Sequence, residues 1–136
     1  MPKKVDTVEH RVIIALASNR YQKNNLSKAR RCLEEIVHHL RFTSEHWTEP
    51  CNTNRPDNYL NQIAEGTTEL DEAALNAWLK QTELNFGRTD RKRRLGIVPI
   101  DLDILQYDDD KRHLSDWSRS YVADLIGELD GQQAQS

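Results

Sequence analysis

Residues 100–104 alternate between apolar side chains and aspartates, and this alternation constrains the fold more than any other feature of the sequence. Successive side chains of a β-strand point to opposite faces of a sheet. The residues predicted to face a core are Ile100, Leu102 and Ile104. Asp101 and Asp103 then share the opposite face, with Cα atoms roughly 6.5–7 Å apart. Two carboxylates held this close favour a cation between them, and Mg²⁺ prefers oxygen ligands. The same pattern also fits a half-exposed strand without a metal, so both interpretations stay open here.

Other periodic segments give the order of the elements. Four segments have the apolar pattern of β-strands: 12–16, 41–49, 59–70 and 100–107. Three segments have apolar residues at the spacing of helices: 26–40, 72–86 and 118–129. The order strand, helix, strand, strand, helix, strand, helix predicts an α+β protein. Its expected core is ferredoxin-like (βαββαβ), with an additional C-terminal helix.

Local signals place the ends of these elements. Asn24 or Asn25 is predicted to cap the first helix and Asp71 the second, while Gly87 ends the second helix. The first strand, residues 12–16, is expected to be buried on both faces because it is a continuous apolar run. The polar segment 50–58 and the basic segment 88–94 are predicted loops, the basic one mobile, and 131–136 is a predicted tail. Within the third strand, Gly66 is expected to cause an interruption.

Composition limits the possible function. The chain has 136 residues, 19 lysines and arginines, 22 aspartates and glutamates, and a formal net charge of −3. One domain is therefore predicted over residues 1–136, with its core at about 11–129, and no nucleic-acid or membrane partner is expected. The longest apolar run, 12–17, is too short for a membrane helix, so a cytoplasmic protein is expected. Cys32 and Cys51 match no metal-binding spacing and are not expected to form a disulfide.

Further candidate residues flank the acidic strand. Arg88 and the run 91–94 are basic, and guanidinium groups bind phosphate oxygens well, although such a run also occurs as a solvated loop. Asn61 offers an amide that suits the edge of a heteroaromatic ring, or a simple structural role. His113 follows the acidic strand, within possible reach of a phosphate. His38 and His39 are predicted on a helix surface, and His10 and His46 have no evident partner.

Several segments are similar, in order and spacing, to those of one enzyme family. They are Ala17-Ser18-Asn19, Thr48-Glu49-Pro50, Tyr59-Leu60-Asn61, Glu83, Gly87-Arg88, Gly96 to Leu105, Tyr107, His113, Arg119, Tyr121 and Glu128-Leu129. Together they span about residues 11–129. They resemble the 6-hydroxymethyl-7,8-dihydropterin pyrophosphokinases, which transfer a pyrophosphoryl group from ATP to a pterin alcohol in folate biosynthesis.

The resemblance implies roles for individual residues. Asp101 and Asp103 are expected to hold two Mg²⁺ ions that bridge the ATP phosphates, and with Arg88 they are the implied catalytic residues. The residues expected to contact the pterin are Asn61 at its edge, Tyr121 on its face, Thr48 and Tyr59. The residues expected to bind ATP are Arg88, Arg91, His113, Glu83 and Arg119. The pterin hydroxyl would attack the β-phosphorus and expel AMP, and the protein is expected to be a monomer.

The chain departs from the family pattern at three positions that bear on the reaction. Val98 stands at the position of the hallmark arginine, Leu95 at that of a loop tryptophan, and Asp90 at that of a second arginine. A degenerate relative that binds pterin or nucleotide with little transfer is therefore an alternative hypothesis. A ferredoxin-like RNA-binding module is a third, which the sequence disfavours because it has no basic-aromatic strand motif.

Overall fold

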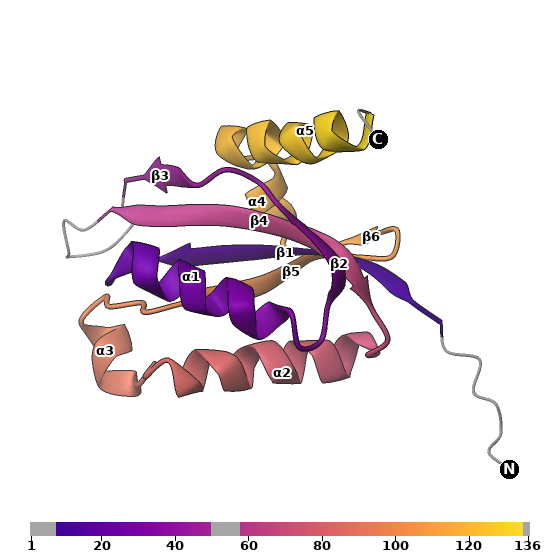
Figure 1. The fold of residues 1–136 in the computed structure, drawn as a ribbon. Coiled ribbons are helices and arrows are strands. Elements are labelled where there is room, and N and C mark those ends of the chain that lie inside the picture. The colour runs from indigo at the N-terminus through magenta and orange to yellow at the C-terminus, as the bar shows by residue number, and fades with distance from the viewer. Residues whose placement is uncertain (1–7, 50–57, 135–136) are drawn as a thin grey trace, which may run out of the picture.

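The computed structural model describes residues 8–49 and 58–134 (Figure 1). The strands are β1 (His10–Ser18), β2 (His38–Phe42), β3 (His46–Thr48), β4 (Tyr59–Thr68), β5 (Asp101–Tyr107) and β6 (Asp110–Lys111). The helices are α1 (Gln22–Leu33), α2 (Glu72–Asn85), α3 (Asp90–Arg94), α4 (Leu114–Trp117) and α5 (Ser120–Ala134). The predicted loop 50–58 lies, except for its last residue, outside the described residues, as does Cys51. Cys32 on α1 is partly buried and free.

All strands belong to one antiparallel sheet with the order β2-β4-β1-β5-β6, and β3 pairs with the start of β4. Helices α1 and α2 cover one face of this sheet, and α5 lies across the other (Figure 1). The predicted ferredoxin-like α+β fold with an additional C-terminal helix is confirmed. Among the described residues, no helix is both long and apolar enough to cross a bilayer.

Each face of the sheet has its own apolar core. The core under α1 and α2 includes Leu26, Leu33, Leu75, Leu79, Val12, Ile14, Leu16 and Leu102. The core under α5 comprises Ile13, Ile63, Leu105, Val122, Leu125 and Leu129. Strand β1 contributes to both, which confirms the prediction that it is buried on both faces. Full burial of one such side chain stabilises a fold by about 1.5–3 kcal/mol.

Helix α5 leaves the end of β1 and the start of β5 uncovered. Ile13 packs under α5, but the next residues on the same face of β1 are the small Ala15 and Ala17. These pair with Asp103 and Asp101 of β5. Small side chains beyond the end of a packed helix leave a hollow, and the pocket described below lies there.

The first helix is shorter than predicted, which corrects the expected span of 26–40. Helix α1 ends at Leu33, and Val37 enters the core from the turn that leads to β2. Gly66 of β4 permits this turn, because a Cβ atom there would lie 2.6 Å from the His38 carbonyl oxygen. The expectation that Gly66 interrupts β4 is therefore wrong, since β4 is continuous from Tyr59 to Thr68.

Capping and histidine positions also differ at this end. The N-cap of α1 is Tyr21, in the left-handed region at φ 46°, so neither predicted asparagine caps the helix. Asn25 instead donates to the carbonyl oxygen of Arg20 at 2.6 Å. His38 and His39 are exposed as expected but lie in β2, not on a helix.

The predicted strand 41–49 is two strands, β2 and β3, because Thr43 interrupts the pairing with β4. The Thr43 hydroxyl accepts a hydrogen bond from the Ile63 amide at 3.0 Å, in place of a backbone carbonyl. The chain resumes regular pairing at His46, opposite Asn61. This break places Thr48 beside the first residues of β4.

The basic segment 88–94 is not an irregular loop, because residues 90–94 form α3. Thr89 caps this helix by accepting a hydrogen bond from the Lys92 amide at 3.1 Å. Gly87, at φ 91°, ends α2 as predicted, and the Asp71 side chain caps the start of α2 at 2.8 Å from the Ala74 amide. At the other end of the chain, α4 precedes α5, and α5 continues to Ala134 through the predicted tail.

Candidate active site

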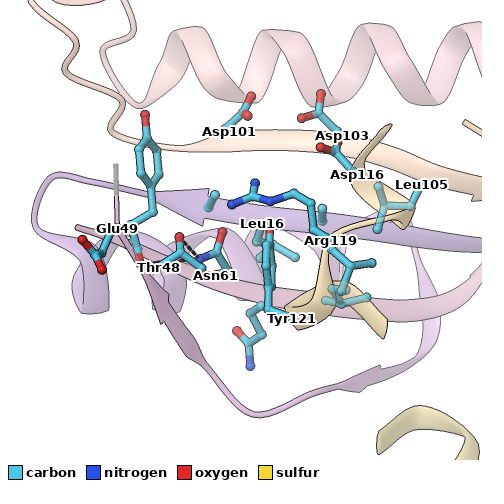
Figure 2. A pocket seen from close by; sticks show the side chains of 16 residues that line it. Leu16, Thr48, Glu49, Asn61, Asp101, Asp103, Leu105, Asp116, Arg119 and Tyr121 are labelled. Atoms are coloured by element: carbon cyan, nitrogen blue, oxygen red, sulfur yellow. Dashed lines mark hydrogen bonds between the residues drawn. The ribbon is translucent and has the colours of Figure 1, made fainter. Parts of the chain in front are cut away.

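A pocket of about 230 Å³ opens on the sheet face that α5 leaves uncovered (Figure 2). Its floor is Ala15 and Ala17 of β1. Other lining residues come from β3, β4, β5, α4, α5 and the link between these two helices: Thr48, Tyr59, Asn61, Asp101, Asp103, Asp116, Arg119 and Tyr121. Seven of the residues named from the sequence as ligand contacts or metal ligands therefore meet in one hollow, and six of them are Thr48, Tyr59, Asn61, Asp101, Asp103 and Tyr121. Arg119, predicted to bind ATP, lines it as well.

One side of the pocket is built around Asn61. Its Nδ2 donates to the His46 carbonyl oxygen and to the Thr48 hydroxyl, both at 2.9 Å. These bonds tie β3 to β4 and fix the plane of the buried amide. No described residue donates to Asn61 Oδ1, so this oxygen remains an acceptor at the pocket wall.

Tyr121, at the start of α5, supplies an aromatic surface on the same side. The His46 ring stacks on it, with centroids 5.5 Å apart and planes 7° apart. The Arg119 guanidinium lies 4.6 Å from the Tyr121 ring centroid. Figure 2 shows the Arg119 side chain reaching across the pocket, between the two aspartates and the side that holds Asn61 and Tyr121. A ligand that enters here meets both a ring and a cation.

The opposite side carries a group of three carboxylates, Glu83, Asp101 and Asp103. Their oxygens lie within 4.8 Å of one another. Asp101 and Asp103 share the pocket face of β5, as the alternation predicted, while Ile100, Leu102 and Ile104 are buried in the core under α1 and α2. Glu83 comes from α2 and is buried beside them. We call these three residues the carboxylate group.

Two basic side chains compensate the carboxylate group. Arg88 pairs with Glu83 at 2.8 Å and with Asp101 at 3.2 Å. Lys80 pairs with Glu83 and with Asp103, both at 3.0 Å. Glu83 also accepts a hydrogen bond from the Leu102 amide at 2.7 Å. Glu83 therefore fixes both cations and the start of β5 relative to α2.

The charges in this group remain crowded. Burial, and then the charges of Asp103 and Glu83, raise the pKa of the Asp101 carboxyl to about 7, against the lowering effect of Arg88 and Lys80. An ordinary aspartate has a pKa of about 3.9. A carboxyl group whose pKa is raised to about 7, first by burial and then by its acidic neighbours, is one that an added cation would ionise.

The donor set fits a hard divalent cation. All three acidic side chains offer oxygen, which Mg²⁺ prefers. The Glu83 side chain is 6% exposed and already accepts three hydrogen bonds, whereas those of Asp101 and Asp103 are 35% and 24% exposed. The two aspartates are therefore the side chains available to a metal ion from the pocket.

A turn at the end of the pocket holds residue 98 in place. Asn19, at the end of β1, donates from Nδ2 to the Gly96 carbonyl oxygen at 2.7 Å. Its Oδ1 accepts from the Val98 amide at 2.7 Å, and its own amide donates to the Val98 carbonyl oxygen at 3.0 Å. Asn19 therefore acts as an anchor for residues 96–98, a role for which the sequence gave no signal beyond its place in the Ala-Ser-Asn segment.

The other residues predicted to bind phosphate lie at different distances from the carboxylate group. His113 Nε2 is 3.9 Å from Asp103 Oδ1, and the side chain is half exposed. Arg91 is exposed on α3 and lies outside the pocket lining. The structure thus brings Arg88 and His113 to the aspartates but leaves Arg91 apart.

Sequence reasoning missed three residues of this region: Lys80, His46 and Asp116. Lys80 looks like one more exposed lysine on a helix, because its partners lie on β5 and one turn along α2. His46 was assigned no partner, yet it stacks on Tyr121. His10 also has partners, since it stacks on Tyr107 at 4.9 Å and its Nδ1 lies 2.8 Å from Asp108 Oδ2.

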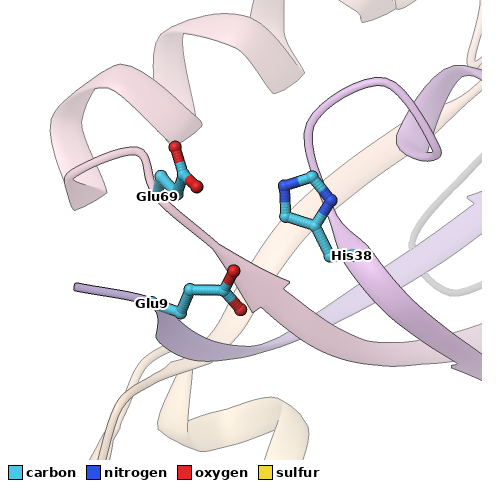
Figure 3. Close-up of side chains that lie close together, drawn as sticks. All are labelled: Glu9, His38 and Glu69. Carbon is cyan, nitrogen blue, oxygen red and sulfur yellow. The ribbon is translucent and has the colours of Figure 1, made fainter. Parts of the chain in front are cut away.

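A second set of possible metal ligands lies at the opposite end of β1 (Figure 3). It consists of Glu9, His38 and Glu69, and all three are exposed. Glu9 accepts a hydrogen bond from the Thr67 hydroxyl at 2.6 Å. Exposed groups of this kind are common without a metal, so the carboxylate group remains the candidate metal centre.

Comparison with known protein families gives one match that covers most of the chain. Residues 13–130 match the model of the family described as 7,8-dihydro-6-hydroxymethylpterin-pyrophosphokinase. This range contains every residue of the pocket lining and of the carboxylate group.

The chain is also similar to curated proteins that are described as folate synthesis proteins. A folate synthesis bifunctional protein of Arabidopsis thaliana is 32% identical over 91% of this chain, which corresponds to 28% of that protein. Mitochondrial folate synthesis bifunctional proteins of Pisum sativum and Arabidopsis thaliana are 33% and 34% identical over the same share of this chain and 27% and 25% of their own lengths. The chain thus spans about a quarter of the length of these relatives.

Proposed function

This chain belongs to the 7,8-dihydro-6-hydroxymethylpterin-pyrophosphokinase family, and on that premise we propose that it transfers a pyrophosphoryl group from ATP to 6-hydroxymethyl-7,8-dihydropterin, with release of AMP. The observation that carries the proposal is the pairing, in one pocket, of an amide and aromatic side with an acidic side. The first suits a flat heterocycle and the second a metal-bound triphosphate.

The pterin is proposed to bind on the side of Asn61 and Tyr121. Asn61 Oδ1 would accept a hydrogen bond from an N–H group at the edge of the ring, while its Nδ2 stays bonded to Thr48 and His46. Tyr121 would stack on the ring face once Arg119 moves from its position over the Tyr121 ring. Tyr59 and Thr48 complete the wall of the pocket.

The phosphates are proposed to bind on the side of the aspartates. Asp101 and Asp103 would hold two Mg²⁺ ions, the number that the family resemblance implies. The metal would neutralise phosphate charge and so favour attack on phosphorus. Arg88 and Arg119 would contribute positive charge beside it and His113 a ring nitrogen, while buried Glu83 holds Arg88 in place. Arg91 would have to approach from α3.

The chemical step is a direct displacement. The pterin hydroxyl oxygen forms a bond to the β-phosphorus, and the bond from that phosphorus to the oxygen bridging the α- and β-phosphates breaks. AMP leaves with the electron pair of that bond, and the hydroxyl proton is released. The protein contributes alignment and electrostatic stabilisation, with no covalent intermediate.

The direct test is to measure AMP formation from ATP with the pterin alcohol and Mg²⁺. We expect AMP and a pterin diphosphate in equal amounts, and no AMP when either the pterin or the metal is omitted. ATP consumption that yields ADP, or that ignores the pterin, would contradict the proposal.

A second candidate function is binding of pterin or nucleotide with little transfer. The observation that favours it is Val98, whose backbone is fixed by Asn19 and whose side chain carries no charge. Loss of one cation that acts in the transition state costs on the order of 3–4 kcal/mol, or 10²–10³ in rate. Calorimetry with the pterin and a non-hydrolysable ATP analogue decides between the two, because binding of both without AMP formation would select this alternative.

A further inference from the structure

Lys80 lies inside the carboxylate group with every donor of its ammonium in use. Its Nζ donates to Asp103 Oδ1 at 3.0 Å, to Glu83 Oε2 at 3.0 Å and to the Leu102 carbonyl oxygen at 2.8 Å. An ammonium group has three donors, so these contacts saturate it. Burial lowers the pKa of Lys80, but Asp103 and Glu83 raise it further, so the side chain is charged.

The two aspartates therefore each have a protein cation of their own. Arg88 contacts Asp101, Lys80 contacts Asp103, and Glu83 joins both cations from behind. In this arrangement two cations partly offset three carboxylates, and each pocket aspartate has a protein partner before any metal ion binds.

A metal ion at Asp103 competes with this arrangement. The oxygen that faces Lys80 is one of only two that Asp103 can offer to a divalent cation. Two cations on one carboxylate repel each other, and this repulsion is strong in a partly buried site. Lys80 must therefore move away from Asp103, or the metal ion must bind more weakly than it would to a bare aspartate.

Lys80 is able to move. Its side chain is 41% exposed, and its four-carbon stem leaves α2 beside the mouth of the site. The displaced ammonium would keep Glu83 as a partner and gain access to a phosphate that the metal ion brings to Asp103.

We propose that Lys80 is a built-in counter-ion that holds Asp103 until a divalent cation displaces it, and that its ammonium then binds a phosphate of the nucleotide. The second half of this proposal rests on the proposed function, since it needs a nucleotide at the aspartates. The first half does not, because it concerns the metal ion alone.

The test uses Lys80→Met, which keeps the unbranched four-atom stem and removes the charged nitrogen. Mn²⁺ binding without nucleotide, followed by electron paramagnetic resonance, is expected to tighten roughly fivefold or more as the competitor is lost. Binding of a non-hydrolysable ATP analogue at saturating Mg²⁺ is expected to weaken by a similar factor. Effects in opposite directions distinguish this role from a structural one, in which both affinities would fall together.

Lys28→Met is the matched control, because Lys28 is exposed on α1 and its loss changes the net charge equally. It is expected to alter neither affinity. If Lys80→Met does not fold, as judged by circular dichroism, Lys80→Gln replaces it with the same expected directions.

Unchanged or weaker Mn²⁺ binding in a folded Lys80 variant would overturn the counter-ion role. Tighter Mn²⁺ binding with unchanged affinity for the ATP analogue would overturn the phosphate role. Neither result depends on turnover: absence of AMP formation by the unaltered protein would defeat the proposed reaction while leaving the Mn²⁺ measurement valid.

Discussion

Asp101 binds its proton more tightly in the folded protein than in the unfolded chain. Its pKa is about 7 when folded, whereas an unfolded aspartate has a pKa of about 3.9. Between these values the folded state binds more protons than the unfolded state, so the free energy of unfolding falls as the pH rises from about 4 to 7. Above pH 7 the metal-free protein carries the full cost of this charge.

Asp101→Asn should therefore stabilise the metal-free protein at high pH. Asparagine cannot ionise, so we expect its melting temperature to exceed that of the unaltered protein at pH 8 and the difference to shrink by pH 5. Thermal melts in a chelator at both pH values measure this. Addition of Mg²⁺ should raise the melting temperature of the unaltered protein more than that of the variant. The compared quantity is the melting temperature of the variant minus that of the unaltered protein. If this difference were smaller at pH 8 than at pH 5, the Asp101 charge would stabilise the fold.

Asn61→Ala should weaken pterin binding by about 1–3 kcal/mol, because it removes hydrogen bonds in a buried wall. Calorimetry with the pterin measures the change, and Asn24→Ala, at an exposed position on α1, is the control. The amide also holds Thr48 and His46, so the melting temperature should be measured as well. Unchanged pterin affinity in a folded variant would place Asn61 outside the site.

At the scale of single residues, the sequence revealed those positions whose geometry is local. The alternation around Asp101 and Asp103 fixes their shared face without reference to the rest of the chain. Lys80 and His46 could not be found in this way, because their partners Asp103 and Tyr121 are brought to them by the fold. Long-range contacts of this kind leave no periodic signal.

At the scale of elements, the prediction fails where two local conformations, a longer helix or a turn followed by a strand, would bury the same apolar residues. Ile36, Val37 and Leu40 continue the stripe of α1 in the sequence, yet they reach the same core from a turn and from β2. Spacing alone cannot separate these two solutions. The turn is chosen by contacts elsewhere, including the Thr68 hydroxyl, which donates to the Ile36 carbonyl oxygen at 2.8 Å.

Helix α3 is an element held mainly by its own backbone. It is one turn and a half long, it buries no side chain, and its N-terminus is capped only by Thr89. Isolated helices this short are marginal in water. The sequence predicts that the basic segment 88–94 is mobile. Because residues 90–94 form α3, we now expect this short helix to open readily.

Hydrogen exchange should show that α3 orders when ligands bind. We expect its amides to exchange rapidly in the free protein and to slow when Mg²⁺, an ATP analogue and the pterin are all present, because phosphate charge attracts its arginines. The amides of β4, which lies between the two cores, serve as an internal reference, and their exchange rates should change less. Equal protection of residues 90–94 in the free and fully liganded protein would contradict this role.

At the scale of the whole molecule, the pocket depends on both cores. Tyr121, on the proposed pterin side, is carried by α5, which packs through Leu125 and Leu129. The acidic side of the pocket is carried by β5 and α2, which pack through Leu102 and Leu79. The two cores lie on opposite faces of one sheet and share β1, whose alternate residues enter each of them.

A shared central strand predicts that the two cores unfold together. If they form one cooperative unit, loss of packing under α5 should lower protection from hydrogen exchange on both faces of the sheet, since the most protected amides exchange through global unfolding. Leu125→Ala leaves a cavity and is expected to cost about 2–5 kcal/mol in the free energy of unfolding. The most protected amides of α2 and of α5 should then lose protection by the same amount.

The comparison of these two helices decides the question. Asp124→Ala, at the exposed position next to Leu125, is the control and should change neither helix. A loss of protection confined to α5, with α2 unchanged, would mean that α5 opens on its own while the core under α1 and α2 stays folded. Tyr121 would then enter and leave the pocket independently of the acidic side, and the affinity for the proposed pterin would fall with the fraction of molecules in which α5 is docked. Equal losses in α2 and α5 would mean instead that any molecule with an intact acidic side also has Tyr121 in place for the proposed pterin.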